Sequence, residues 1–494
     1  MNPRFDVVIR NAQVFDGSGA PAFASDVAID ADRIARIGDL GGASAGREID
    51  ATGLALAPGF IDVHTHDDFA VMAAPDMAFK SRGGVTTCMV GNCGFGAAPY
   101  AAAKTLLGGL TPGLEPSQYE GHAGYAAAVE HLGPGVNIGV LAGHGTIRLA
   151  AMGHAPRDAN TAELAQMCAI MDEALDAGVF GLSSGLAYDP GRYAPTQELI
   201  EIAAQMRGSG ALYATHLRDQ GEHLLESVAE AIEIGDKAGV GVQISHHKAS
   251  GRENWGQVRE SLKLIDAAQA RGLKVYADQY PYTAGSTMLA AVLLNDAFNP
   301  SGAMSSLRPA DVVVASAPGH PQWEGQSIET LSMQMAGTAR ATAEHVVAQC
   351  PSATAILHMI SEDDVQTVMR HASTMIGSDG IPALGGRPHP RLYNSFARVL
   401  GHYSRELAIL DMTTAVHRMT GFSASVFGIT DRGLVTPGAF ADLVLFDPAS
   451  IIDQGTFDEP NQYPTGIQEV FVNGVSTIRD DKVSGTRAGR LLRR

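Results

Sequence analysis

Apolar, strand-like runs alternate with helical stretches along most of this chain, and this alternation limits the folds that the chain can adopt. Between the runs, apolar residues recur near i, i+3, i+4 and i+7, the spacing of an amphipathic helix. This order is typical of a parallel sheet made from βα units. The runs predict the eight strands of an α/β fold, a (β/α)8 TIM-like barrel, and occupy residues 59–66, 85–94, 136–145, 179–188, 211–218, 240–248, 273–282 and 373–380.

The two ends of the chain have a different pattern of apolar and polar residues. Short alternating runs broken by Gly and Asp fill residues 5–57, and the carboxyl end repeats the pattern with an Asn-Gly turn signal. Both ends therefore predict antiparallel strands. We expect them to build one small β-sandwich domain from residues 1–57 and 426–494, around a catalytic barrel of residues 58–425.

One connection in the predicted barrel is longer than all the others. Residues 282–373 separate the seventh and eighth strands and are rich in Met, Ala and Pro. Long insertions of this kind commonly form lids over an active site. We therefore predict an inserted lid at about 286–348.

The charge balance excludes several classes of partner. Lys and Arg total 35 against 53 Asp and Glu, a net charge of −18, so we expect neither nucleic acid nor a membrane as a partner. The chain has no apolar run of about 18 residues, and its amino terminus does not have the pattern of a signal peptide. Four cysteines are too few for a disulfide framework. These features predict a cytoplasmic protein and leave its oligomeric state open.

Residue types that bind metals recur at the carboxyl ends of the predicted strands. His64 and His66 lie two apart on the first strand, so both imidazoles point to one face. Taken alone, this pair fits a core held by backbone hydrogen bonds equally well. Active sites of barrel enzymes lie where the strand ends meet, and Zn²⁺ prefers thiolate and imidazole ligands. The residues predicted to converge there are His64, His66, Cys93, His216, His246 and the carboxylate Asp379.

Cations near the same rim suit an anionic substrate. Lys248 shares the metal-facing side of the sixth strand, and Tyr280 and Tyr282 end the seventh. Arg391 follows the eighth strand, and its guanidinium can pair with a carboxylate through two hydrogen bonds. A surface salt bridge is the alternative role for either cation.

Motifs spread over nearly the whole chain carry a family resemblance. They are DVVIRNAQVFDGSG, GFIDVHTHDD, GNCGFGAAP, GLSSGLAYDPG, ATHLRD, ISHHK, MIGSDG, HPRLYNSF and ADLVLFDP. A chain with these motifs resembles the amidohydrolase superfamily and, within it, the N-acyl-D-amino-acid deacylases, also called D-aminoacylases. The HxH block marks only the superfamily, whereas GNCG, SHHK and HPRLYNSF together are far more specific.

The resemblance implies a role for each metal-binding position. The ligands of one tightly bound Zn²⁺ would be Cys93, His216 and His246. A second, weaker metal position would lie at His64 and His66, with Cys93 as a bridge and Asp379 nearby. Many superfamily members instead bridge two metals through a carboxylated lysine on the fourth strand. That strand contains no lysine here, which favours the cysteine-bridged form.

The resemblance also implies a reaction. It is the zinc-dependent hydrolysis of the amide bond of an N-acyl-D-amino acid, which gives a carboxylate and a free D-amino acid. Zn²⁺ lowers the pKa of water to about 7 and polarises the carbonyl, and Asp379 would carry the proton to the leaving amine. The residues implied to hold the small-molecule substrate are Lys248, Tyr280, Ser286, Arg391 and Tyr188.

Three alternatives use the same barrel. A cyclic amidase of the hydantoinase or dihydropyrimidinase type would cleave ring amides that have no free carboxylate, and a dipeptidase would act on D-residues. A non-catalytic paralogue normally has ligands missing, whereas every ligand position is filled here. The sequence leaves open the acyl group, the occupancy of the second metal position and the preferred side chain, which could be apolar or that of D-Glu or D-Asp.

Overall fold

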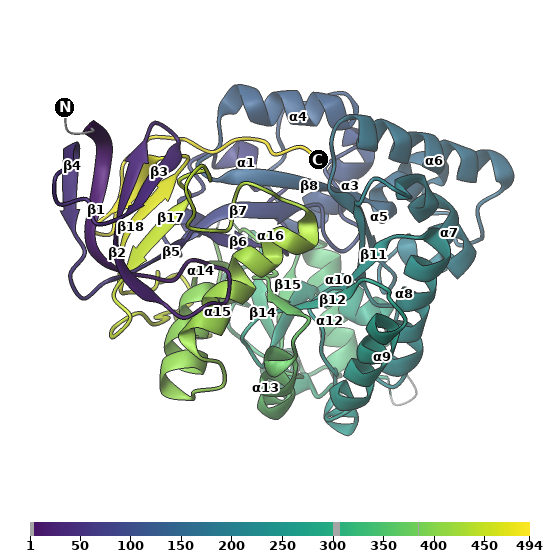
Figure 1. Ribbon diagram of the computed structural model, residues 1–494. Coiled ribbons are helices and arrows are strands. Elements are labelled where there is room, and N and C mark those ends of the chain that lie inside the picture. Colours follow the sequence, from purple (N-terminus) through teal and green to yellow (C-terminus); the bar gives the residue numbers. More distant parts are fainter. Residues whose placement is uncertain (1–3, 300–306, 384) are drawn as a thin grey trace.

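A barrel of eight parallel strands forms the centre of the molecule (Figure 1). The computed structural model describes residues 4–299, 307–383 and 385–494. The barrel strands are β6 (Phe60–Asp62), β7 (Val85–Val90), β8 (Asn137–Gly143), β9 (Gly181–Gly185), β10 (Leu212–His216), β11 (Gly241–Ile244), β12 (Val275–Gln279) and β16 (Thr374–Ile376). They pair in this order, each parallel to the next, and each lies within one of the eight predicted runs. The predicted (β/α)8 fold is confirmed.

Helices surround the barrel and turn their apolar faces to its strands. In α8 (Leu224–Ala238), Leu224, Val228 and Ala231 are buried, and the helix ends at Gly239 in the left-handed conformation of a glycine cap. The other α-helices outside the insertion, among the described residues, are α1 (Ala70–Ala73), α2 (Ala78–Ser81), α3 (Tyr100–Leu110), α4 (Gly121–Leu132), α5 (His144–Met152), α6 (Thr161–Asp176), α7 (Thr196–Ala203), α9 (Val258–Ala270), α13 (Glu362–Arg370), α14 (Arg391–Arg398), α15 (Met412–Met419) and α16 (Gly421–Phe427). In the part of the chain that the structure describes, no helix is both long enough and apolar enough to cross a membrane.

The first and last barrel strands meet at their carboxyl ends. Thr65 and Gly380 form a parallel bridge. Next to it, the His66 N–H donates to the Gly380 carbonyl at 3.0 Å, and the Asp379 N–H donates to the His64 carbonyl at 2.7 Å. These contacts close the ring at the end where the predicted metal ligands lie.

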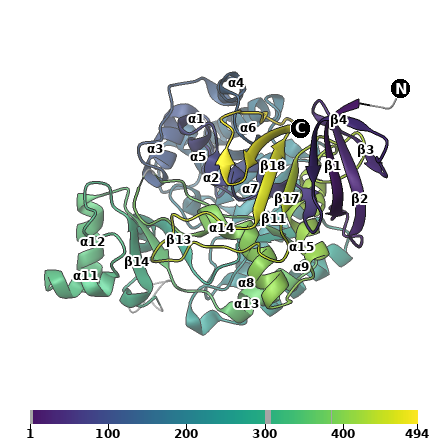
Figure 2. The same ribbon diagram turned by 90° about the vertical axis from the view of Figure 1, so that its left-hand side faces the viewer.

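Strands from both ends of the chain form an additional domain beside the barrel, as predicted (Figure 2). Leu56 of β5 is paired with Leu445 of β17 in antiparallel register. The nine strands make one hydrogen-bonded sheet with a shared apolar core. They are β1 (Arg4–Val14), β2 (Phe23–Asp30), β3 (Arg33–Gly38), β4 (Ser44–Asp50), β5 (Ala55–Pro58), β17 (Leu443–Phe446), β18 (Ile467–Val472), β19 (Val475–Arg479) and β20 (Lys482–Val483). The exact domain boundaries stay a prediction, and residues 1–3 lie outside the described residues.

The long connection between β12 and β16 has its own secondary structure. Its three strands pair in the order β13 (Gly285–Met288), β15 (Thr354–Leu357), β14 (Val312–Ser316), and its helices are α10 (Leu289–Leu294), α11 (Ile328–Met335) and α12 (Ala339–Gln349). This unit projects from one side of the molecule (Figure 2). Its central strand β15 lies beyond residue 348, the end of the predicted lid. Residues 300–306 of that lid lie outside the described residues, and a lid function stays a prediction.

A buried carboxylate joins the small domain to the barrel. Asp442 pairs with Arg432, and both side chains are 3 % exposed. The same carboxylate accepts hydrogen bonds from Asn137 Nδ2 of β8 at 3.0 Å and from the Asn473 N–H at 2.7 Å. Asp442 therefore bridges the two domains through contacts that water does not reach.

We expect Asp442→Ala to lower the free energy of unfolding by about 3 kcal/mol, because it leaves the Arg432 guanidinium buried and unpaired. Denaturant unfolding followed by circular dichroism measures this loss. Glu233→Ala is the control, since it removes an ion pair with Lys237 in which both side chains are about half exposed, and should change stability by less than about 1 kcal/mol. Equal effects of the two variants would contradict a bridging role for Asp442.

Candidate metal centre

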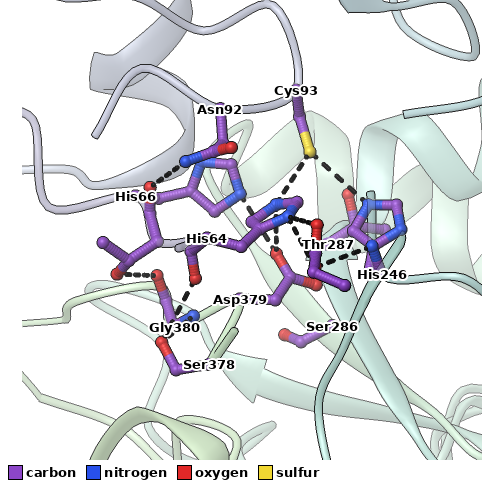
Figure 3. Close-up of polar contacts among 12 residues, drawn as sticks. His64, His66, Asn92, Cys93, His246, Ser286, Thr287, Ser378, Asp379 and Gly380 are labelled. Atoms are coloured by element: carbon purple, nitrogen blue, oxygen red, sulfur yellow. Dashed lines mark hydrogen bonds and ion pairs between the residues drawn. The ribbon is translucent and has the colours of Figure 1, made fainter. Parts of the chain in front are cut away.

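Thiolate, imidazole and carboxylate groups meet at the carboxyl end of the barrel (Figure 3). Cys93 Sγ lies 3.3 Å from His64 Nε2 and 3.5 Å from His246 Nε2. Asp379 Oδ1 lies 3.2 Å from His66 Nε2 and 3.4 Å from His64 Nε2. The donor atoms therefore converge on one small volume.

The donors divide into two groups that share Cys93. In each group, all donor atoms lie within 4.8 Å of one another. One group contains Cys93, His216 and His246, and the other contains His64, His66, Cys93 and Asp379. The structure thus brings together all six residues predicted as ligands. Sulfur, nitrogen and oxygen donors in this combination fit Zn²⁺, and a shared thiolate fits two neighbouring metal positions.

The charges around Cys93 favour its thiolate. Burial by itself raises the pKa of the Cys93 thiol, but the positive charge of His64, whose own pKa is raised well above its usual range by Asp278, outweighs burial and holds the pKa of Cys93 well below its usual range. Burial and the nearby Lys248 ammonium lower the pKa of His246 to about 3. Burial likewise lowers the pKa of His216. The first group therefore contains a thiolate and two neutral imidazoles, which are the protonation states that bind a metal.

Three of the donors have left-handed backbone conformations. The φ angles are 54° at Cys93, 38° at His246 and 50° at Asp379. A residue with a side chain adopts this region at a cost of about 1–3 kcal/mol, and such residues cluster at functional sites. Each of the three lies two or three residues beyond the end of its strand, where the left-handed turn directs the side chain into the barrel mouth.

A second layer of buried groups orients the imidazoles. Asp278 of β12 accepts from His64 Nδ1 at 3.1 Å and from the His246 N–H at 2.9 Å. Gln243 Nε2 donates to the same carboxylate at 2.6 Å. Because Asp278 binds Nδ1, Nε2 is the His64 nitrogen that faces Cys93 and would bind a metal. Asp278 was not among the predicted site residues, although a carboxylate within the apolar seventh strand was the available signal.

A buried lysine supports the segment after β6 that carries His64 and His66. Lys80 Nζ lies 2.8 Å from both Asp62 Oδ2 and Thr65 Oγ1, and 3.0 Å from Ser378 Oγ. Ser378 also donates its backbone N–H to Asp62 at 2.8 Å. This network joins β6 to the turn that carries Asp379.

A pocket opens from the donor cluster toward solvent, and most of the predicted substrate-binding residues lie in its wall. They are Tyr188, Lys248, Tyr280 and Ser286. The hydroxyls of Tyr280 and Tyr282 are both buried without a hydrogen-bond partner among the described residues, but Tyr280 lines the pocket, whereas Tyr282 packs against Phe457. Between the two tyrosines that the sequence left open, the geometry favours Tyr280.

The two predicted cations have different partners and line different cavities. Lys248 Nζ contacts His246 Nδ1 at 3.0 Å, and burial lowers the pKa of this lysine to about 8. Arg391 is 1 % exposed, lies behind Asp379 with Nη1 2.9 Å from Oδ2, and lines a smaller cavity next to the pocket. Its Nη2 donates to the Ser286 carbonyl at 3.2 Å. Burial alone raises the pKa of Asp379, but Arg391 and the neighbouring imidazoles hold it well below its usual range.

Comparison with known proteins agrees with this arrangement. The model of the amidohydrolase family matches residues 47–317 and 330–478. The chain belongs to the amidohydrolase family. It is 40 % identical to a D-aminoacylase of Alcaligenes xylosoxydans xylosoxydans, covering 99 % of this chain and 98 % of that protein. It is 38 % identical to an N-acyl-D-aspartate deacylase of the same organism, covering 99 % and 95 % of the two chains.

A solved structure extends this likeness to three dimensions. The N-acyl-D-glutamate deacylase of Bordetella bronchiseptica, crystallised with zinc and a phosphonate that mimics the tetrahedral intermediate, superposes with a TM-score of 0.90. It is 36 % identical and covers 99 % of this chain and 100 % of its own. Within the amidohydrolases, the chain therefore belongs with the D-aminoacylases and N-acyl-D-amino-acid deacylases.

We expect Asp278→Ala to weaken Zn²⁺ binding by about 10- to 100-fold, because His64 loses the carboxylate that fixes its orientation. Competition with a fluorescent chelator measures the affinity. Asp266→Ala is a matched control, since Asp266 is exposed and bonds only His371 among the described residues. Unchanged affinity in folded Asp278→Ala protein would contradict the orienting role.

Proposed function

We propose that this protein is a zinc-dependent N-acyl-D-amino-acid deacylase, which hydrolyses the amide bond to a carboxylate and a free D-amino acid. One observation carries the proposal. A buried Cys93, histidine and Asp379 donor cluster opens directly into a pocket whose walls carry Lys248 and the unpartnered Tyr280 hydroxyl. Such a site can polarise an amide and bind a carboxylate at a fixed distance from it. Membership of the deacylase group supports the same reaction.

We assign the tight Zn²⁺ position to Cys93, His216 and His246, and a weaker second position to His64 and His66, with Asp379 beside it. The protonation states of Cys93, His216 and His246 support the tighter binding at the first position, because these ligands are already deprotonated before a metal binds. When bound, Zn²⁺ supplies a Lewis acid that polarises the amide carbonyl and acidifies water.

The substrate's carboxylate would be held by groups whose hydrogen-bonding capacity is unused. Both the Tyr280 hydroxyl and Arg391 Nε are buried and lack a partner among the described residues. Buried polar atoms are rarely left unpaired in proteins, so their lack of partners points to a ligand. Lys248, Ser286 and Tyr188 lie in the pocket wall with Tyr280, and Arg391 reaches this wall from the smaller cavity, which Ser286 also lines.

Asp379 is suited to carry the proton. Its pKa is low, so the carboxylate is ionised and can accept a proton from the attacking water. Its Oδ1 faces the imidazoles and its Oδ2 faces Arg391, so the proton is gained beside the donor cluster. The same oxygen can then return the proton to the leaving amine.

Turnover of paired enantiomers tests the proposal. We expect purified protein with about one or more zinc per chain to hydrolyse N-acetyl-D-methionine, with kcat/KM at least about 100-fold above that for the L-enantiomer. When the carboxylate and the scissile carbonyl are both held in place, only one enantiomer can direct its side chain into the pocket. Release of the free amino acid is the readout. Cleavage of dihydrouracil or hydantoin without cleavage of N-acetyl-D-methionine would favour a cyclic amidase instead.

The outer part of the pocket favours uncharged side chains. Its apolar lining comes from Leu217, Ala291, Val292, Leu307, Leu357 and Met359. Two arginines in the wall are already paired, Arg218 with Glu230 at 2.8 Å and the half-exposed Arg252 with Asp311 at 3.7 Å. Residues 300–306, PSGAMSS, include no Lys or Arg. An acidic side chain of the substrate would therefore be desolvated in the pocket without an unpaired cation to compensate its charge, among the residues that the structure describes.

We expect kcat/KM for N-acetyl-D-methionine and N-acetyl-D-leucine to exceed that for N-acetyl-D-glutamate and N-acetyl-D-aspartate by at least about tenfold, from the cost of burying an unpaired charge. Steady-state kinetics at 0.1 M salt measure the ratio. The Leu217→Lys variant places a cation in the pocket wall and should reduce this ratio. A parent enzyme that prefers the acidic substrates would overturn the side-chain assignment while leaving the deacylase activity in place.

A further inference from the structure

The loop of residues 447–466 reaches from the small domain to the substrate-binding side of the barrel. It connects β17 and β18, which are antiparallel neighbours that about two to five residues usually join. The loop is instead fastened to α14. Arg398 Nη1 pairs with Asp453 Oδ2 at 2.7 Å, and Asn394 Nδ2 donates to the Gln462 carbonyl at 2.9 Å.

Phe457 at the tip of this loop packs against residues next to the pocket. Its ring centroid lies 5.0 Å from that of His389, 4.9 Å from His358 and 6.3 Å from Tyr282, in edge-on arrangements. His358 lines the pocket itself. An aromatic side chain of the small domain therefore braces the wall of the barrel's pocket from behind.

His389 uses both ring nitrogens to fix the backbone around the carboxylate-binding groups. Its Nδ1 accepts from the Arg391 N–H at 3.1 Å. The proton is then on Nε2, which donates to the Ala284 carbonyl at 2.9 Å. The side chain is 4 % exposed, and burial holds the pKa of His389 well below its usual range, so the ring stays neutral with one donor and one acceptor.

These two hydrogen bonds link two separate segments of the site. Arg391 begins α14, whereas Ala284 directly precedes β13, which carries Ser286. The same two segments meet again where Arg391 Nη2 donates to the Ser286 carbonyl at 3.2 Å. The Arg391 guanidinium also lies over the Tyr280 ring, with Cζ 4.5 Å from its centroid. His389 therefore sets the spacing among the groups assigned to the substrate's carboxylate.

We infer that His389, braced by Phe457, is a positioning residue that holds Arg391 and Ser286 at the substrate's carboxylate, so that the loop of residues 447–466 controls substrate affinity. The inference rests on the proposed function, since it requires a substrate with a carboxylate. Among the described residues, the hydrogen bonds of His389 go to Arg391 and Ala284, and neither His389 nor Phe457 belongs to the donor cluster. The expected effect is on binding of the carboxylate and not on the chemical step.

The test compares N-acetyl-D-methionine with its methyl ester, which lacks the negative charge. We expect His389→Ala to raise KM for the acid about tenfold, change kcat less than about threefold and leave the zinc content at the parent value. KM for the ester should stay within about twofold. If the ester is cleaved too slowly, its inhibition constant against the acid replaces KM.

Conservative variants separate positioning from folding. In His389→Asn, the amide oxygen can still accept from the N–H two residues later, as in an Asx turn, so KM for the acid should return to within about threefold of the parent. Phe457→Ala should raise KM for the acid in the same direction as His389→Ala. Phe23→Ala is the control in the small domain, because Phe23 is 40 % exposed and lies on β2, and it should leave KM unchanged.

Each outcome supports or overturns the inference. Parent-like KM for the acid in folded His389→Ala, or equal losses for acid and ester, would overturn the role of His389. If His389→Ala does not fold, the KM values of His389→Asn and Phe457→Ala test the inference instead. A parent-like KM for the acid in Phe457→Ala would contradict the role of the loop. If the parent cleaves no N-acyl-D-amino acid, the proposed function fails and this inference with it. If the parent cleaves N-acyl-D-amino acids and the variants keep the parent KM, the inference is contradicted and the proposed function stands.

Discussion

Closure of the barrel between β6 and β16 is the interaction on which the rest of the site depends. The His64 carbonyl accepts from the Asp379 N–H at 2.7 Å, which places the first strand's imidazoles against the last strand's carboxylate. Beneath them, buried Asp62 accepts from the Ser378 N–H, and Lys80 balances its charge. More than 300 residues separate the two strands in sequence, as the positions of His64 and Asp379 show. Only the closed ring makes them neighbours.

Electrostatics and backbone strain at the centre reinforce each other. Cys93, His246 and Asp379 have left-handed backbone conformations, which the surrounding closed sheet stabilises. The resulting crowding of imidazoles around one sulfur keeps Cys93 ionised despite complete burial. Asp278 then aligns His64, and Arg391 keeps Asp379 ionised. The chain therefore holds Cys93, His216 and His246 in the protonation states that bind a metal.

Much of this arrangement could be predicted because it follows from local pattern. The period of apolar residues identified the barrel strands, and ligand residue types at strand ends identified Cys93 and the histidines. Asp278 and His389 escaped prediction because their roles depend on contacts between distant segments. The alternation of side chains along a strand does not distinguish Tyr280 from Tyr282 as the substrate-binding residue, because both point to the same side of an extended chain. The tertiary packing favours Tyr280, since Tyr282 packs against Phe457.

The sequence by itself determined the (β/α)8 barrel, the additional β-domain made from both ends, and the chemical types of the groups at the barrel mouth. These depend on the order of apolar and polar residues along short stretches, which any folded form of the chain must respect. Only the tertiary structure decided which donors share Cys93, where Arg391 lies relative to Asp379, and that a loop of the small domain reaches His389. The physical reason is that side-chain geometry at a site is set by contacts between segments far apart in the chain, and those contacts exist only once the barrel has closed.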